Sequence, residues 1–285
     1  MPELPEVEIT ARRLGSALAG AEVSSSLAPG VATLKTFDPP LGALDGATVL
    51  GVRRIGKMLA TDFETADGPL TLLVHLMSAG RLQVFDKHAS LKDRRSRLLV
   101  RVADGRELRL REFGTRQSAW AKLLPSADVD AEEMVATLGP DAWPAPPREQ
   151  FARLIDRPGH LHPQLRDQRT IAGIGRSWVD EILWEARLSP FKQGSELRGE
   201  EIARLHAALH VLGDAIEHYE DVIGDEIPDK MPMPLRVHRR EGEPCPRCGT
   251  TIEAVFFSEH QMNYCPAEQT GGRVLKDRRL SRLLK

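Results

Sequence analysis

Apolar residues recur at helical spacing at the start of the chain and at strand-like spacing after it. In residues 5–18 they fall on one face, which predicts an amphipathic helix. From about residue 21 to residue 123 the apolar runs are shorter, which is typical of strands. The clearest predicted strands are 71–75, 80–85, 97–102 and 106–110.

Helical spacing returns in the second half of the chain. Before it, residues 125–147 are acidic and rich in proline, which predicts a linker between domains. The last fifty residues return to short strands around three cysteines. The predicted helices are 148–156, 161–167, 178–186 and 200–220.

Length and composition narrow the class of protein. A chain of 285 residues predicts two domains, or one domain with a smaller module. No apolar run reaches the roughly 18 residues that a membrane span needs, and the N-terminus lacks the pattern of a secretory leader. The cysteines suit a reducing compartment. We therefore expect a cytoplasmic protein.

The distribution of charge matters more than its sum. A net charge of −2 argues against a uniformly basic nucleic-acid binder. However, residues 91–122 carry ten Lys or Arg against four Asp or Glu, and residues 231–285 carry ten against six. Local basic surfaces can neutralise phosphates, although a charge run is more often a solvated face.

The three cysteines have metal-ligand spacing. Cys245 and Cys248 form a CxxC knuckle. Separated from it by sixteen residues, Cys265 and Glu268 form a second knuckle with a carboxylate in the last position. Zinc binds thiolates and carboxylates, so the pattern predicts a structural zinc site of three cysteines and Glu268. His260 is an alternative fourth ligand. A metal-free hairpin held by packing is the other interpretation.

Pro2 becomes a secondary amine if the initiator Met1 is removed, as is routine ahead of a small residue. Such an amine attacks an electrophilic carbon and condenses to an iminium without a cofactor. An α-amino group is partly neutral near neutral pH, and Glu3 and Glu6 are placed to shuttle its protons. The alternative is structural: Pro2 starts a helix and the carboxylates complement its dipole.

Two arginines and a phenylalanine share one face of a predicted strand. Arg109 and Arg111 alternate with Leu108 and Leu110, and Phe113 continues the arginine face. When a nucleotide is flipped out of a duplex, an arginine can bind the orphaned base while a ring wedges the stack. The default interpretation without further support is a salt-bridged sheet face.

The segment 168–177 lies between two predicted helices and contains two glycines that allow close approach to a phosphate. Ser177 is placed to cap the following helix. Lys57 stands in a strand-like run, where a lone lysine is usually a solvated edge residue.

These features occur together in one family. The chain resembles the formamidopyrimidine-DNA glycosylase and endonuclease VIII family of base-excision repair enzymes over essentially its whole length. The resemblance rests on PELPEVE at the start, RRIGKMLA around Lys57, REFGT at 111–115, LGPD at 138–141, LRDQRTIAGIG at 165–175 and the cysteine-bearing end.

The resemblance implies an α+β fold. Its parts are an N-terminal β-sandwich with an N-terminal helix, a C-terminal helix-two-turn-helix domain and a zinc-finger-like β-hairpin. We expect these parts at 1–124, 148–235 and 236–285, the last including a basic tail, with the linker at 125–147.

The resemblance also implies roles for single residues. Lys57 joins the catalytic set of Pro2, Glu3 and Glu6 as a phosphate contact near the lesion. Arg111 and Phe113 match the R-x-F-G pair that stabilises the opposite strand.

Other implied DNA contacts lie in three loops. One begins at His75, itself an implied contact, where the chain reads HLMSAG and the family reads HLGMSG. Either Met77 or Ser78 therefore fills the gap left by the everted base; an ordinary core Met77 is the alternative. Gln168 lies in the helix-two-turn-helix, and His260 in the hairpin.

Three departures from the family bear on function. Arg176 replaces an asparagine that holds a phosphate, and His260 replaces an arginine that inserts toward DNA. The segment between residues 220 and 236 is shorter than the loop that caps an oxidised purine. This shortening argues against assuming 8-oxoguanine as the substrate.

The sequence therefore predicts a monomeric bifunctional DNA glycosylase and AP lyase. Its expected partner is duplex DNA with damaged bases or abasic sites, bound in the bacterial nucleoid, and Pro2 forms a Schiff base that undergoes β,δ-elimination. The alternative is a lesion-sensing or structure-sensing DNA-binding protein on the same scaffold, with weak or no excision.

Overall fold

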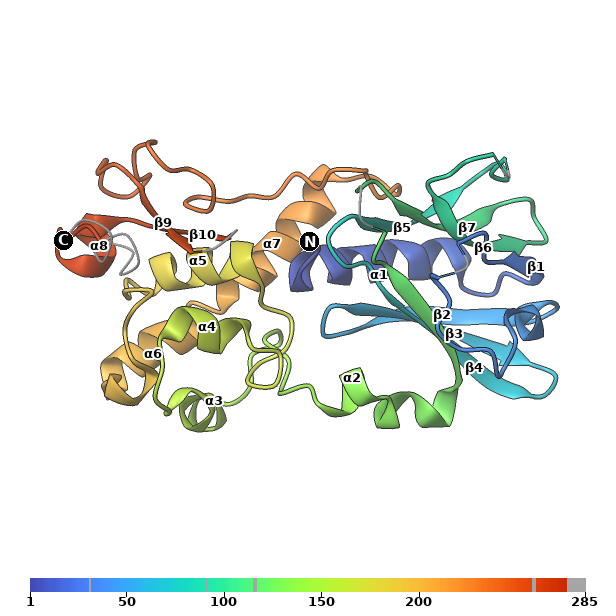
Figure 1. Cartoon of the computed structure of the whole chain (residues 1–285), viewed down its shortest axis with the longest axis horizontal. Coiled ribbons are helices and arrows are strands. Elements are labelled where there is room, and N and C mark those ends of the chain that lie inside the picture. Colours follow the sequence, from blue (N-terminus) through green and yellow to red (C-terminus); the bar gives the residue numbers. More distant parts are fainter. Residues whose placement is uncertain (31, 91, 115–116, 258–259, 276–285) are drawn as a thin grey trace. The chain divides into compact units, whose positions relative to one another are not determined.

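The structure of the protein, a computed structural model, describes all residues except 31, 91, 115–116, 258–259 and 276–285 (Figure 1). The chain forms two compact units. The first unit comprises Met1–Thr137 and Ile216–Pro232, and the second comprises Leu138–Ala215 and Met233–Lys285. Most of the predicted basic tail lies outside the described residues.

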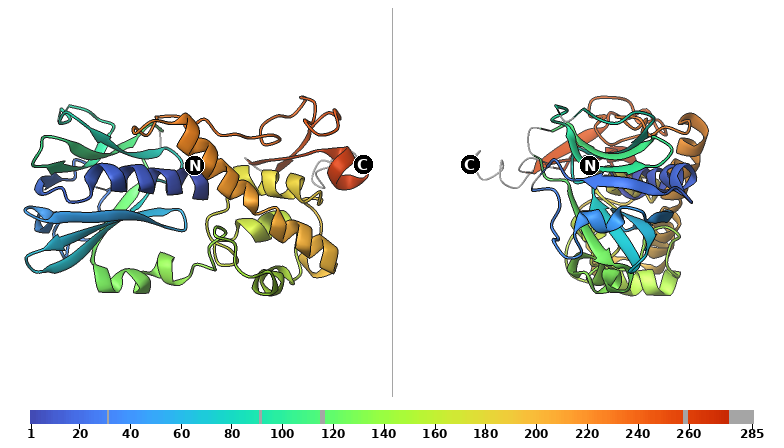
Figure 2. Two further views of the ribbon diagram at one scale, coloured as in Figure 1. Left: turned by 180° about the vertical axis from the view of Figure 1, so that it is seen from behind. Right: turned by 90° about the vertical axis from the view of Figure 1, so that its right-hand side faces the viewer.

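Two four-stranded antiparallel sheets build the first unit (Figures 1 and 2). The first sheet has the order β1-β6-β7-β5, and the second has the order β2-β3-β4-β8. The first sheet contains β1 (Val23–Leu27), β6 (Ser96–Val102), β7 (Glu107–Glu112) and β5 (Gly80–Phe85). The second contains β2 (Thr48–Ile55), β3 (Met58–Thr65), β4 (Gly68–His75) and β8 (Trp120–Pro125).

Helix α1 (Leu4–Leu18) runs alongside both sheets and packs against their edge strands β2 and β5 (Figure 1). Its apolar face, with Val7, Leu14 and Leu18 fully or almost fully buried, joins one core with the inner faces of the sheets. The amphipathic helix predicted at 5–18 is therefore confirmed. Burial of this face is the main stabilising contribution, because isolated helices of this length are marginal in water.

The predicted linker contains regular structure. The segment folds into the 3₁₀ turn η2 (Ser126–Ala131) and the short helix α2 (Glu133–Ala136), both in the first unit. A second 3₁₀ turn, η1 (Leu41–Leu44), lies between β1 and β2. The compact units thus divide the chain at residue 137 on this side, within the predicted linker.

The second unit contains the helices and the hairpin. The helices are α3 (Arg148–Ile155), α4 (Leu161–Arg166), α5 (Arg176–Glu185), α6 (Gly199–Ala207), α7 (His210–Val222) and α8 (Pro266–Thr270), with the 3₁₀ turn η3 (Gly194–Glu196). Of α7, only the part up to Ala215 belongs to this unit. The antiparallel hairpin consists of β9 (Glu253–Phe257) and β10 (His260–Tyr264). No helix among the described residues is long and apolar enough to cross a bilayer.

The single helix predicted at 200–220 is wrong. The chain turns at Ala208 and Leu209, between α6 and α7. The Leu209 N–H binds the His206 carbonyl, and the His210 imidazole meets the Ala207 carbonyl, Nδ1 2.8 Å away. Because Ala208 and Leu209 are buried, helical spacing of apolar residues continues through the turn and hides it.

The start of α5 also differs from expectation. The helix begins at Arg176, and Gly175 is the N-cap residue. Ser177 lies inside the first turn, so its predicted role as the cap is wrong. Residues 216–232, expected with the helical domain, belong to the first unit because the end of α7 and the chain after it bind α1 and β5.

Candidate functional site

The N-terminal residues form a cap around the start of α1. Glu3 is the N-cap residue and makes a reciprocal capping box with Glu6, whose Oε2 accepts the Glu3 N–H at 2.8 Å. The first turn carries Pro5, whereas Pro2 precedes the cap. The interpretation of Pro2 as the helix-starting proline is therefore wrong. Glu3 and Glu6 are 2 % and 3 % exposed, so both carboxylates are held inside the protein.

Pro2 borders a cavity of about 50 Å³. The charged groups on its wall are Glu6 and Arg81, and the rest is mostly apolar. Burial lowers the pKa of the Arg81 guanidinium, while the charges of Asp229 and Glu6 oppose that shift. The structure thus brings the predicted nucleophile together with one predicted carboxylate and one cation. The remaining lining residues are Met1, Thr10, Leu76, Leu82, Ile227 and Met231.

Tyr219 reaches the same carboxylate from α7. Its hydroxyl donates to Glu6 Oε1 at 2.6 Å, and the tyrosine is fully buried. Burial first, and then the charge of Glu6, raise the pKa of Tyr219 far above its usual value, so the phenol remains a donor. Nothing in the sequence singles out this residue, because 213 positions separate it from Glu6 and it resembles any core aromatic.

Lys57 and His75 form a second pair near the ends of strands. Lys57 lies in the turn between β2 and β3 and is only 8 % exposed, so its interpretation as a solvated edge residue is wrong. His75 ends β4 and stacks on Trp120, with ring centroids 5.7 Å apart. Burial, and then the charge of Lys57, lower the pKa of His75 to about 4. The Met77 N–H donates to Nδ1 at 3.0 Å, which leaves the imidazole proton on Nε2.

The loop after His75 is a tight turn. The Gly80 N–H donates to the Leu76 carbonyl at 2.8 Å, which closes the turn. Met77 has φ of 49° and is half-buried, so it is not an ordinary core residue. A left-handed backbone costs a non-glycine residue about 1 kcal/mol or more, and such strain is common in binding loops. Ser78 is exposed beside it.

The arginine face of β7 divides into a buried and a more accessible part. Arg109 is buried and pairs with Glu107 at 2.7 Å, which makes it a structural residue. Arg111 lies 4.7 Å from the ring centroid of Phe113, which is 38 % exposed. This is the predicted pairing of a cation with an aromatic wedge.

Arg111 is held by the chain that follows α7. Its Nη1 lies 3.0 Å from Asp229 Oδ1 and 3.3 Å from Gln83 Oε1. Gln83 Nε2 in turn donates to the Ile227 carbonyl at 2.7 Å, and Arg81 Nε donates to the Asp229 carbonyl at 2.8 Å. The short segment after α7 is therefore bound to β5 and β7 through Asp229 and the Ile227 carbonyl, and we call this contact the latch.

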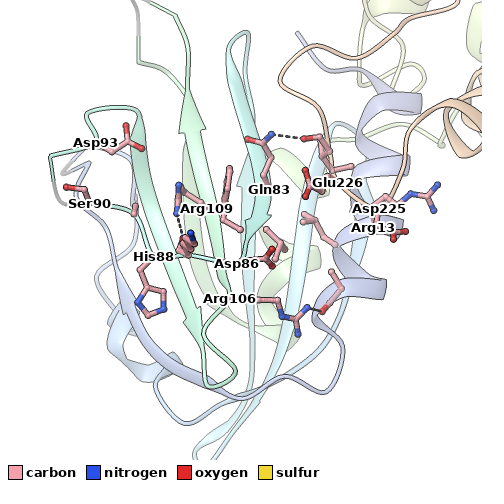
Figure 3. Close-up of a pocket in the computed structure, with 17 residues that line it drawn as sticks. Arg13, Gln83, Asp86, His88, Ser90, Asp93, Arg106, Arg109, Asp225 and Glu226 are labelled. Atoms are coloured by element: carbon pink, nitrogen blue, oxygen red, sulfur yellow. Dashed lines mark hydrogen bonds between the residues drawn. The ribbon is translucent and has the colours of Figure 1, made fainter.

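A larger cavity of about 650 Å³ lies elsewhere in the first unit (Figure 3). Two of its arginines are bound within the protein itself: Arg109 donates to the Lys87 carbonyl and Arg106 to the Ala17 carbonyl (Figure 3). Pro2 does not line it. Size alone therefore does not locate the reactive site.

The loop between α4 and α5 is shaped by Gln168. Its Nε2 donates to the carbonyls of Arg166 and Ile174, both at 2.8 Å, and its Oε1 accepts the Gly173 N–H. The amide of this predicted DNA contact thus holds the two turns in place. Arg176, by contrast, is exposed at the first position of α5.

Three thiols converge in the second unit. The Sγ atoms of Cys245, Cys248 and Cys265 lie within 4.8 Å of one another, and none forms a disulfide. The Trp184 indole N–H donates to Cys245 Sγ at 3.4 Å. Thiolates at this spacing are the ligands that zinc prefers in structural sites.

The predicted fourth ligand does not join this group in the described part of the chain. Glu268 instead directs Oε2 to Arg187 at 3.1 Å and to Arg247 at 3.4 Å. Arg247 also stacks over Trp184, 3.9 Å from the ring centroid. Two guanidinium groups compete for the carboxylate, which is the physical reason for the difference. The side chain of the alternative ligand, His260, lies outside the described residues.

Comparison with known proteins divides the chain into an N-terminal sandwich, a helical region and a cysteine-bearing hairpin, as the structure does. Residues 1–116 match the formamidopyrimidine-DNA glycosylase N-terminal domain, residues 138–226 its H2TH domain, and residues 242–267 the zinc finger found in FPG and IleRS. A formamidopyrimidine-DNA glycosylase of Roseiflexus sp. is 32% identical over 281 residues, which are 93% of this chain and 98% of the relative. The chain belongs to the formamidopyrimidine-DNA glycosylase family.

Further relatives and solved structures support the membership. An uncharacterized formamidopyrimidine-DNA glycosylase-like protein of Mycobacterium tuberculosis is 41% identical over 149 residues, 52% of this chain and 94% of that protein. The Lactococcus lactis Fpg in complex with DNA containing an abasic site matches with a TM-score of 0.82 and 26% identity, covering 94% of this chain and 99% of that chain. A mutant of that Fpg with DNA containing Fapy-dG matches with a TM-score of 0.82 and 28% identity, covering 94% and 100%.

Two predictions are confirmed by these matches. The family fold is the predicted one, with a sandwich and N-terminal helix followed by a helical H2TH region and a hairpin. The zinc-finger match coincides with the three-thiol cluster, so the family's structural zinc belongs here and Cys245, Cys248 and Cys265 would hold it.

Proposed function

We propose that the protein is a bifunctional DNA glycosylase and AP lyase that removes damaged bases from duplex DNA through Pro2. The observation that carries the proposal is the cavity shared by Pro2 and Glu6 at the capped start of α1. The solved relatives in complex with DNA containing an abasic site or Fapy-dG support DNA with such lesions as the substrate class.

The reaction begins with the ring nitrogen of Pro2. The neutral amine attacks C1′ of the sugar, the bond between C1′ and the base breaks, and the base leaves with its bonding electrons and takes up a proton. The amine then gives its own proton to the Glu3 carboxylate. Glu3 passes this proton to O4′ as the sugar ring opens, the C1′–O4′ bond breaks and the nitrogen lone pair forms the iminium. Glu6 assists as a negative charge beside the nitrogen.

Strand cleavage follows from the iminium. Its positive charge acidifies the C2′ proton, whose loss expels the 3′-phosphate in the β-elimination. Loss of the C4′ proton then expels the 5′-phosphate in the δ-elimination. Water hydrolyses the remaining iminium and restores the Pro2 amine.

Other residues of this chain hold the DNA. Lys57 supplies a cation and neutral His75 an N–H donor for phosphates, a division of labour that the lowered pKa of His75 supports. Met77 or Ser78 fills the gap left by the everted base, and Arg111 with Phe113 contacts the opposite strand.

The phosphate contacts continue in the second unit. Arg176 and His260 bind backbone phosphates, and the internally bonded amide of Gln168 keeps the H2TH turns in shape. The three cysteines would bind zinc, which supplies structural stability to the hairpin. We also propose 148–235 and 236–285 as the sequence segments of the H2TH and zinc-finger modules, with residues 216–232 of the first segment packed in the first compact unit.

Borohydride trapping tests the lyase. A duplex with one abasic site is mixed with the protein and sodium borohydride, which reduces an iminium to a stable amine. The expected result is a covalent protein–DNA adduct, and without borohydride a nicked strand. Absence of both, with intact protein that binds the duplex, would leave the lesion-sensing alternative as the function.

Two variants make the test specific. Pro2→Gly is expected to lose strand cleavage and keep DNA affinity. A chain with one extra residue ahead of Pro2 keeps the ring but turns its nitrogen into an amide, and it is expected to give no adduct at Pro2. A panel of duplexes with different damaged bases, scored for base release, then identifies the substrate.

A further inference from the structure

The end of α7 is bound to α1 by more than apolar packing. Arg13 on α1 donates to the carbonyls of Glu220 and Gly224, and its Nη1 pairs with Glu220 Oε2 at 2.8 Å. Arg12 pairs with Glu220 Oε1 at 3.2 Å. These contacts place the last turns of α7 against the helix that carries the reactive N-terminus, so Tyr219 has a fixed position beside Glu6.

Each carboxylate oxygen of Glu6 has its own donor. Oε1 accepts the Tyr219 hydroxyl at 2.6 Å, and Oε2 accepts the Glu3 N–H at 2.8 Å. Donors to both oxygens favour the ionised carboxylate over the carboxylic acid. They also fix its orientation, since Glu6 and Tyr219 are both buried. A charge that is held in place before the reaction begins is more effective than one that must reorient.

We propose that Tyr219 is a positioning residue for the Pro2 reaction, because its hydroxyl holds Glu6 as an oriented carboxylate beside the nitrogen that becomes an iminium. The inference rests on the proposed function of Pro2. It adds a residue from α7, far along the chain, to a site whose charged groups otherwise come from the first residues and from β5.

The charged and titratable groups around Glu6 determine how loss of the Tyr219 hydroxyl changes the pH dependence of the reaction. Before its helix, Glu6 has Glu3 as a neighbour and shares the cavity wall with Pro2; from β5 it faces Arg81, and from α7 it faces Tyr219. Loss of the tyrosine hydroxyl removes a donor from the charged form of Glu6 and therefore makes Glu6 easier to protonate. The trapping rate should then fall at a higher pH than in the wild type.

The test measures the single-turnover rate of borohydride trapping on an abasic duplex as a function of pH. Tyr219→Phe is expected to lower the rate roughly tenfold. The acidic limb of the pH profile, where the rate falls as the pH is lowered, should move upward by about one pH unit, and the DNA affinity should stay unchanged. In a Glu6→Gln background, Tyr219→Phe is expected to have no further effect on the limb, because the carboxylate that Tyr219 holds is gone and the remaining limb reflects only the protonation of the Pro2 amine.

Glu220→Gln is the matched control. It weakens the contact between α7 and α1 without touching Glu6, and it should leave the acidic limb where it is. If the rate of Tyr219→Phe falls in acid at the same pH as that of the wild type, the inference is overturned, whether or not the rate is lower at every pH. If the wild type itself forms no adduct, the proposed function fails first, and the two failures are thereby distinguished.

A second measurement avoids dependence on the folding of Tyr219→Phe. The chain contains only two tyrosines, so in a Tyr264→Phe background a fluorotyrosine is incorporated at position 219 alone. Its more acidic phenol is a stronger donor and is expected to move the acidic limb to lower pH, opposite to Tyr219→Phe. An unmoved limb would contradict the role of Tyr219.

Discussion

The buried imidazole of His75 predicts a loss of stability in acid that a single substitution removes. Burial and Lys57 lower the pKa of His75 from 6.5 to about 4 in the folded protein. The unfolded chain therefore takes up a proton at a higher pH than the folded chain does. This contribution to stability is complete above about pH 6.5 and is lost as the pH falls toward 4.

The magnitude follows from the difference between the two pKa values. Each unit is worth about 1.4 kcal/mol, so the full loss is about 3 kcal/mol and about 2 kcal/mol is already lost at pH 5. No correction for solvent screening is needed, since His75 is only 9% exposed. An effect of this size is a large share of the 5–15 kcal/mol that is typical of domains.

The assay compares urea unfolding of the wild type and His75→Asn between about pH 7.5 and about pH 5. Asparagine keeps an acceptor near the position of Nδ1 for the Met77 N–H but does not titrate. The wild type is expected to lose about 2 kcal/mol more than the variant over this range. His88→Asn, which removes an exposed histidine from the same unit, should behave like the wild type. An equal slope in His75→Asn and the wild type would refute the reasoning.

Three further predictions concern the latch, the metal and the second unit. Asp229→Asn releases Arg111, so the affinity for an abasic duplex, measured by fluorescence anisotropy, should rise severalfold; an unchanged affinity would show that the carboxylate does not compete with DNA. Glu268→Gln should keep one zinc per chain by elemental analysis whereas Cys265→Ser loses it, and equal loss would place the carboxylate on the metal. Glu181 on α5 accepts the N–H groups of Arg236, Val237 and His238. Glu181→Ala leaves these groups without their acceptor and should lower the unfolding free energy by roughly 3 kcal/mol or more in urea, while a change under about 1 kcal/mol would contradict this.

The sequence predicted those parts of the fold whose signal is local. The apolar face of residues 5–18 and the alternation along β7 each contain the information for their element. The break between α6 and α7 has no such signal, because Ala208 and Leu209 are apolar and buried in a turn as they would be in a helix.

The site was predictable in its chemistry but not in its contacts. PELPEVE places Pro2, Glu3 and Glu6 within five residues, so their proximity follows from the chain itself. Tyr219 joins them only through tertiary packing. The same limit applies to Glu268, whose spacing suits zinc while its surroundings supply two arginines.

The most direct test of the central claim is to locate the covalent bond. After borohydride trapping on an abasic duplex, the adduct is digested with nuclease and protease and sequenced by mass spectrometry. The sugar remnant is expected on the nitrogen of Pro2 in a peptide that lacks Met1. A remnant on a lysine such as Lys57, or an active preparation that retains Met1 on every chain, would contradict it.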